Sequence, residues 1–185
     1  MNPLIQEYIN LLYDKYESLN MTVPTGMEII YYINIKLIEE LSSKQQNILF
    51  LCPNVVTATQ TYIAFCGGIK QNPEHKITSY CDFPNGSYIH FLPHNQVQKQ
   101  LYDHCDVIIL HGLYAVLDRL SKHFIDNLSN IKKIITINCT LKNLEESLFN
   151  DNTKHVKINR IDDLNNIALN LRKYKLEKIK EKYHE

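Results

Sequence analysis

Histidine and cysteine are the residue types in this sequence that could form a structural zinc site. The chain has eight His and five Cys. His90 and His94 are four residues apart, but Pro93 lies between them and the preceding segment has a strand-like pattern, so they do not share a helix face. No group of these residues has the close paired spacing of a structural zinc site. We therefore expect neither a bound metal nor a cofactor.

Cys52 is the candidate for covalent chemistry. It ends a short apolar run, 48–52, and a loop and a helical segment follow, which is a setting where thiols of lowered pKa occur. A C-x5-R phosphatase motif would need Arg at position 58, where the sequence has Ala58, and a C-x4-T pattern fits loosely through Thr57. A small α/β enzyme that uses Cys52, or an unusual nucleotide site, is thus the alternative hypothesis; a cysteine buried in a strand explains the residue better.

Composition indicates an ordinary globular chain. The sequence has 185 residues, of which 44% are hydrophobic and 22% charged, which suits one domain, or one domain with a terminal appendage. Lys and Arg number 20, and so do Asp and Glu, so the formal net charge is zero. A cationic surface over the whole protein is therefore not expected, although a local basic patch is compatible with this balance.

The sequence also suggests where the protein resides. Apolar runs such as 107–110 are too short to span a bilayer, and the first ten residues lack a basic segment followed by an apolar one. The cysteines are odd in number and form no C-x-x-C pair, which indicates reduced thiols. We expect an intracellular protein of the cytoplasm or nucleus that is not secreted and does not associate with membranes.

Hydrophobic periodicity predicts helices that alternate with short strands. Apolar residues recur at helical spacing in 3–18, 27–42, 56–66, 95–103, 117–128, 141–149 and 161–183, whereas 20–26 is expected to be a loop because it contains Pro and Gly. Continuous apolar runs predict buried strands at 48–52, 106–110 and 131–137, and 155–159 is expected to be a further strand. Asn85-Gly86 between two alternating segments, 76–81 and 87–92, predicts a hairpin.

This pattern predicts an α/β fold. Strands without alternation are typical of a mainly parallel sheet with helices on both faces, into which one β-hairpin is inserted. We expect 48–52, 107–110 and 131–137 to be neighbouring buried strands of one sheet. The domain then covers residues 1–160, and 161–185 forms a C-terminal helix.

The order of these segments resembles the ATPase domain of a phage or viral terminase large subunit, which is related to the first RecA-like lobe of superfamily 2 helicases. The resemblance rests on the succession of Thr25-Gly26 before a helix, ILFLCPN at 48–54, NGSYIHFLP at 85–93, DVIILHG at 106–112 and IKKIITINCT at 131–140. It implies a P-loop NTPase-like, RecA-like sheet. It also implies a viral source, with which the abundance of Ile, Asn, Lys and Tyr, whose codons are rich in A and T, agrees.

Both nucleotide motifs of that family are degenerate in this chain. In VPTGMEII, Thr25 and Gly26 fit the phosphate loop, but Met27 stands in place of the lysine and Glu28 in place of the hydroxyl that binds Mg²⁺. The strand at 107–110 ends in His111-Gly112 instead of the acidic pair. The resemblance therefore implies a pseudo-ATPase with no catalytic residues, whose role is to bind a protein or nucleic acid.

Basic residues concentrate in the terminal helix. Arg172, Lys173, Lys175 and Lys178 are the candidate contacts for a nucleic-acid backbone, with Glu177 and Glu181 opposing them. A solvated helix end explains the same pattern. We expect weak, non-specific nucleic-acid binding at most, and a protein partner or a homo-oligomer as the main assembly.

Overall fold

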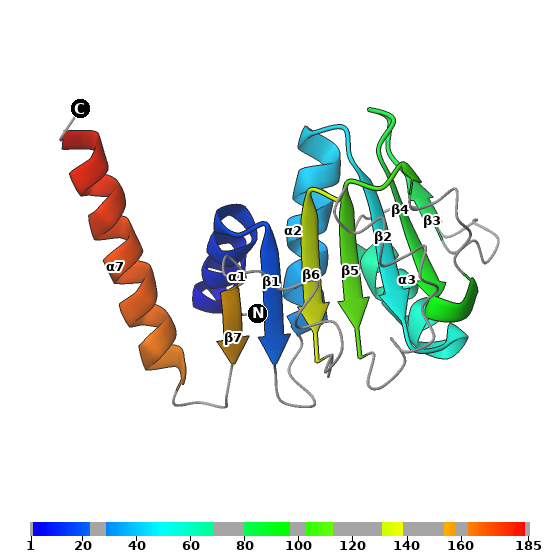
Figure 1. Cartoon of the computed structure of the whole chain (residues 1–185), viewed down its shortest axis with the longest axis horizontal. Helices are drawn as coiled ribbons and strands as arrows, with labels where there is room; N and C mark the ends of the chain where they lie inside the picture. The colour runs from blue at the N-terminus through cyan, green and yellow to red at the C-terminus, as the bar shows by residue number, and fades with distance from the viewer. Residues whose placement is uncertain are drawn as a thin grey trace.

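The structure is a computed structural model, and it describes residues 2–22, 29–68, 80–96, 103–112, 131–138, 154–157 and 163–183. The described part is a single sheet with helices packed against it (Figure 1). The strands are β1 (Ser18–Thr22), β2 (Asn47–Cys52), β3 (Tyr80–Asp82), β4 (Tyr88–Pro93), β5 (Val107–His111), β6 (Lys133–Ile137) and β7 (Lys154–Lys157). The helices are α1 (Pro3–Lys15), α2 (Ile29–Ser43), α3 (Val55–Gly68) and α7 (Asp163–Tyr183), with one 3-10 turn, η1 (His94–Gln96).

The seven strands follow the order β3-β4-β2-β5-β6-β1-β7. Only β3 and β4, joined by the Asn85-Gly86 turn, pair antiparallel; every other neighbouring pair is parallel. The prediction that 48–52, 107–110 and 131–137 are adjacent strands is confirmed, because β2, β5 and β6 are consecutive in the sheet. One strand, β6, separates β1 from β5, and this arrangement is that of a RecA-like α/β fold.

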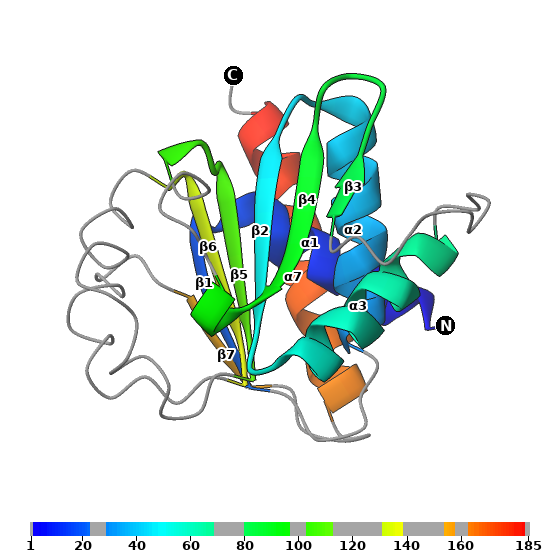
Figure 2. The ribbon, with the colours of Figure 1, turned by 90° about the vertical axis from the view of Figure 1, so that its right-hand side faces the viewer.

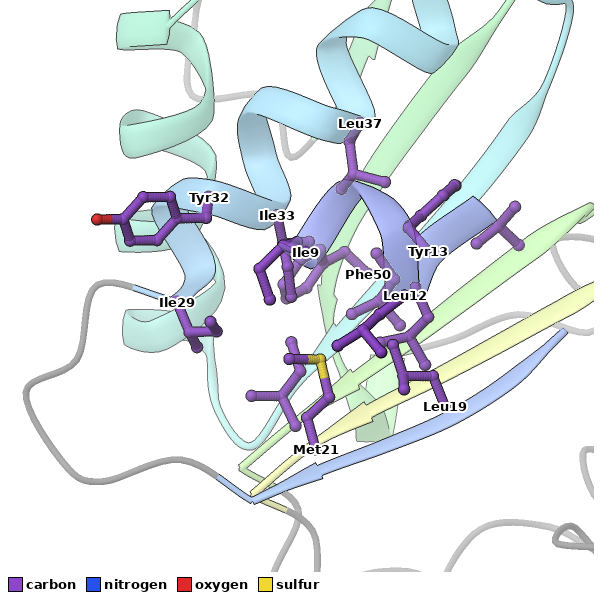
Figure 3. Packing of buried hydrophobic residues seen from close by; sticks show 14 of the residues in the cluster. Ile9, Leu12, Tyr13, Leu19, Met21, Ile29, Tyr32, Ile33, Leu37 and Phe50 are labelled. Atoms are coloured by element: carbon purple, nitrogen blue, oxygen red, sulfur yellow. The ribbon is translucent and has the colours of Figure 1, made fainter. Parts of the chain in front are cut away.

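Helices α1, α2 and α3 lie along one face of the sheet, and α7 packs on α1 (Figure 2). Their apolar faces meet alternate residues of the strands, and Figure 3 shows the centre of this core, where Ile9, Ile33 and Met21 converge near Phe50. The residues of the opposite face are buried as well; they include Leu49, Leu51, Ile108 and Leu110. Burial on both faces explains why these strands show no alternation in sequence.

The prediction of a loop is wrong for residues 20–22. That prediction covered 20–26, but Ser18–Thr22 forms β1, an interior strand between β6 and β7. Leu19 and Met21 are buried in the core, while Asn20 is satisfied by the hydroxyl of Thr136, which donates to Asn20 Oδ1 at 2.7 Å. A polar residue is tolerated in this strand because a neighbouring strand supplies its hydrogen bond.

Parts of the predicted pattern lie outside the described residues. These are the helices expected at 117–128 and 141–149, the first half of the hairpin before Tyr80, and residues 97–102 of the helix expected at 95–103, whose start is the 3-10 turn η1. The terminal helix is confirmed as α7. Its residues Ile167 and Leu171 belong to the main core, so α7 is packed against the domain and is not a free appendage.

Candidate functional site

The carboxyl ends of the parallel strands are where an α/β sheet of this kind binds its ligands. Figure 1 shows β1, β5 and β6 ending along one edge, where the chain continues from Thr22, His111 and Ile137. The positions predicted to be a degenerate phosphate loop, Thr25, Gly26, Met27 and Glu28, lie outside the described residues. They follow β1 and precede α2 in the chain, which is the position that the resemblance assigns to a phosphate loop.

His111 and Gly112 occupy the end of β5, as the sequence analysis predicted. The imidazole of His111 lies beside the ring of Phe50, with 6.3 Å between ring centroids, and its Nδ1 is buried without a hydrogen-bond partner among the described residues. Burial lowers the pKa of His111, so the side chain is neutral at neutral pH. A neutral imidazole brings no negative charge to this strand end, unlike the carboxylates that hold Mg²⁺ in an active ATPase.

Gly112 is fixed by the backbone of its neighbours. Its φ of 64° lies in the left-handed region, and its N–H donates to the carbonyl of Ile137 at 2.8 Å. In the same way Asn138, with a φ of 51°, donates its N–H to the carbonyl of Met21 at 2.8 Å. The ends of β5, β6 and β1 are thus tied together. An acidic residue at position 112 would meet a backbone strain of roughly 1–2 kcal/mol.

The surroundings of Cys52 do not favour a nucleophile. The residue is fully buried, and burial raises the pKa of its thiol to about 12. Its only described polar partner is the hydroxyl of Thr61, 3.9 Å from the sulfur. Thr57 is engaged elsewhere, because its N–H and hydroxyl both donate to Asn54 Oδ1, at 2.9 and 3.2 Å, and so cap α3. A thiol held protonated in this way is unreactive at neutral pH.

The described residues contain neither a metal-binding cluster nor a membrane-spanning helix. No group of three or more His, Cys, Asp or Glu side chains is placed there to hold a metal ion. Nor does any helix within those ranges combine the length and apolar character needed to cross a bilayer.

The basic residues of α7 do not form one patch. Arg172, Lys173, Lys175 and Lys178 are all exposed, but Lys175 pairs with Glu7 of α1 at 2.6 Å and Lys178 lies 5.8 Å from the ring centroid of Tyr174. Arg172 and Lys173 take part in none of the ion pairs of the described residues. The four predicted contacts therefore differ in how available they are to a ligand.

An apolar seam on α7 was missed by the sequence analysis. Leu169, Leu176 and Ile179 are 51%, 54% and 53% exposed, while Ile167 and Leu171 are buried in the core. At 100° per residue the first three lie on the side of the helix opposite the last two. The signal was present in the sequence as a spacing of seven and then three residues, which is that of one helix face.

In sequence, the chain matches no model of a protein family and no curated protein. The strand order and the chemistry of the residues at the strand ends therefore carry the functional argument.

Proposed function

We propose that this chain is a RecA-like domain without ATP hydrolysis, related to the ATPase domain of a viral terminase large subunit, and that it acts as an accessory binding factor. The observation that carries the proposal is the end of β5, which holds His111 and Gly112 and is separated from β1 by the single strand β6. An ATPase of this fold needs acidic side chains there to hold Mg²⁺ and to activate water.

The sequence after β1 supports the same conclusion independently. Met27 cannot neutralise phosphate charge, and Glu28 would repel a triphosphate. Phosphoryl transfer depends on positioning and on stabilisation of charge in the transition state. The loss of the lysine, the hydroxyl and both carboxylates removes the main sources of that stabilisation while leaving the sheet intact.

The outer face of α7 is the binding surface that fits this role best. It combines an exposed apolar seam, formed by Leu169, Leu176 and Ile179, with the exposed cations Arg172, Lys173 and Lys180. A partner helix with an apolar stripe flanked by acidic residues complements both features. Two copies of this chain would bring like charges together along the seam, so a different protein fits it better than a second copy.

The first expected result concerns nucleotide. Addition of ATP or a non-hydrolysable analogue with Mg²⁺ should leave the melting temperature unchanged, because only a ligand of the native state stabilises it. The variant Met27→Lys/Glu28→Thr should also show no hydrolysis, since His111 and Gly112 still supply no carboxylate. Thermal shift and phosphate release are the measurements. Mg²⁺-dependent ATP binding of micromolar affinity, seen by isothermal titration, would overturn the proposal.

The second expected result separates protein from nucleic acid as the ligand of α7. Labelled DNA should bind weakly, and its affinity should fall with salt with a log–log slope no steeper than about −5, because the segment 172–182 has six Lys and Arg residues to release counterions. A labelled acidic amphipathic peptide should bind more tightly. Replacement of Leu176 by Ser should weaken the peptide and leave DNA unchanged, whereas Arg172→Gln/Lys173→Gln/Lys180→Gln should weaken both.

Fluorescence anisotropy at several salt concentrations measures both ligands. Lys175→Gln is the matched control, because this lysine already pairs with Glu7 and its loss should change either affinity little. Substitutions are preferable to removal of the helix, since truncation after Asn170 would delete Leu171 from the core. Sequence-specific, salt-insensitive DNA binding that survives the triple substitution would place the functional surface elsewhere on the domain.

A further inference from the structure

Two cysteines on different elements bring their sulfur atoms together. Cys66 lies near the end of α3 and Cys81 is the middle residue of β3, and their Sγ atoms are 3.4 Å apart. Both residues are only partly buried, and neither is in a disulfide. A disulfide bond is about 2.0 Å long, so a small shift of the two side chains suffices to form one.

We propose that Cys66 and Cys81 form a redox pair that a hydroperoxide oxidises to a disulfide. One thiol attacks hydrogen peroxide, which breaks the O–O bond, gives a sulfenic acid and releases water. The second sulfur then displaces the hydroxyl group, which leaves as a second water molecule, and the S–S bond forms. Two thiols and one peroxide thus become one disulfide and two waters, and a small dithiol reverses the reaction.

The other described cysteines lack this geometry. Cys52 is fully buried beside Thr61, and Cys105 is buried with its thiol donating to the carbonyl of Val107 at 2.9 Å. Burial raises the pKa of both thiols to about 12. No second sulfur lies against either of them among the described residues, so neither can resolve a sulfenic acid into a disulfide.

The surroundings of the pair make its oxidation slow. Burial, together with the hydrogen bond and the charge of Cys66, raises the pKa of Cys81 to about 12, and the neighbouring Asp82 acts in the same direction, whereas a hydrogen bond from Tyr62 opposes them. The Cys81 thiolate is therefore scarce at neutral pH. The pair is suited to respond to sustained exposure to peroxide more than to brief pulses.

The bond would connect two elements that meet at one edge of the sheet. β3 is the outermost strand on its side and is only three residues long, while α3 packs on β4 next to it. The cross-link would close the segment between residues 66 and 81 and so restrict the unfolded chain. For a loop of this length, the melting temperature should rise by roughly 5–10 °C.

The test uses the full chain, purified in the reduced state and treated with hydrogen peroxide. Intact-mass spectrometry under non-reducing conditions should show the loss of two hydrogen atoms, and peptide mapping should recover the peptide that links Cys66 to Cys81. The melting temperature should rise and should return to its initial value after dithiothreitol. Cys66→Ser and Cys81→Ser should each abolish the linked peptide and the rise, while Cys105→Ser should retain both.

These readouts decide the proposal. The mass and mapping experiments need only the wild-type chain, so a variant that fails to fold does not weaken them. Oxidation to sulfinic acid at either sulfur, a disulfide that joins other cysteines, or a linked peptide without any rise in melting temperature would each overturn the proposal.

Discussion

Replacement of Glu40 by Gln is expected to lower the free energy of unfolding by about 3 kcal/mol. Glu40 and Lys36 form an ion pair at 3.2 Å between side chains that are only 7% and 5% exposed. Lys44 contacts the same carboxylate at 2.9 Å. Removal of one partner of a buried pair leaves the other charge uncompensated, and the expected loss lies at the low end of the usual range because Lys36 keeps its contact with Asp14 at 3.0 Å.

Glu39 provides the matched control. Its carboxylate lies on the same helix 3.8 Å from Lys36, but the side chain is 61% exposed. Glu39→Gln should therefore change the free energy of unfolding by less than about 1 kcal/mol. Urea denaturation of both variants measures the difference. Equal effects of the two substitutions would contradict the burial of the Lys36–Glu40 pair.

The pH dependence of stability should also differ between the wild type and Glu40→Gln. Burial alone would raise the pKa of Glu40, but the hydrogen bonds from Lys44 and Lys36 outweigh it and hold that pKa below the ordinary value of 4.5. A lowered pKa in the folded state stabilises the fold above the unfolded pKa, and this contribution is lost as pH falls through the folded pKa. As pH falls below the ordinary value of 4.5, the wild type should thus lose more stability than Glu40→Gln.

Replacement of Phe91 by Ala is expected to lower the free energy of unfolding by about 3–5 kcal/mol. The ring is fully buried between α3 and the sheet, with centroid distances of 5.2 Å to Phe65, 5.3 Å to Phe50 and 5.9 Å to Tyr62. Its loss opens a cavity among side chains that rigid neighbours hold in place, so little of the cavity can close.

Tyr80→Ala is the comparison for this substitution. Tyr80 is 40% exposed on the edge strand β3 and stacks on His90 with 5.2 Å between centroids. Tyr80→Ala should lower the free energy of unfolding by no more than about 1.5 kcal/mol, because the Tyr80 ring does not fill a closed cavity. Chemical denaturation with unchanged m-values would attribute both effects to the native state. A loss for Phe91→Ala as small as that for Tyr80→Ala would contradict the close packing of this aromatic cluster.

The parts of the fold that could be predicted are those that have a recognisable pattern in the local sequence. The runs 48–52 and 107–110 are continuous apolar segments because both faces of their strands are buried, and the Asn85-Gly86 turn has a backbone requirement that two residues reveal. Strand β1 has no such sequence pattern. Its sequence SLNMT contains only two apolar residues, and the hydrogen bond that accommodates Asn20 comes from Thr136, more than a hundred residues away.

The candidate site shows the same division. The residues at the end of β5 could be assigned from sequence because they directly follow an apolar strand. The contact of Cys66 with Cys81 could not, since α3 and β3 meet only through the order of the sheet. The burial of Lys36 and Glu40 could not be predicted either, because charged side chains on a helix ordinarily face solvent. These two are buried together and have Asp14 and Lys44 as further ion-pair partners.

The strand order also sets the earliest moment at which the chain can complete its sheet during synthesis. Leu19 of β1 pairs with Ile135 on one side and with Lys154 on the other. At typical rates of about 5–20 residues per second, the ribosome needs several seconds or more to make the residues that lie between β1 and its partners. Throughout that interval β1 has neither of its native neighbours, β6 and β7. Folding must therefore finish late, and a chaperone that shields Leu19 and Met21 would have its greatest effect on the nascent chain.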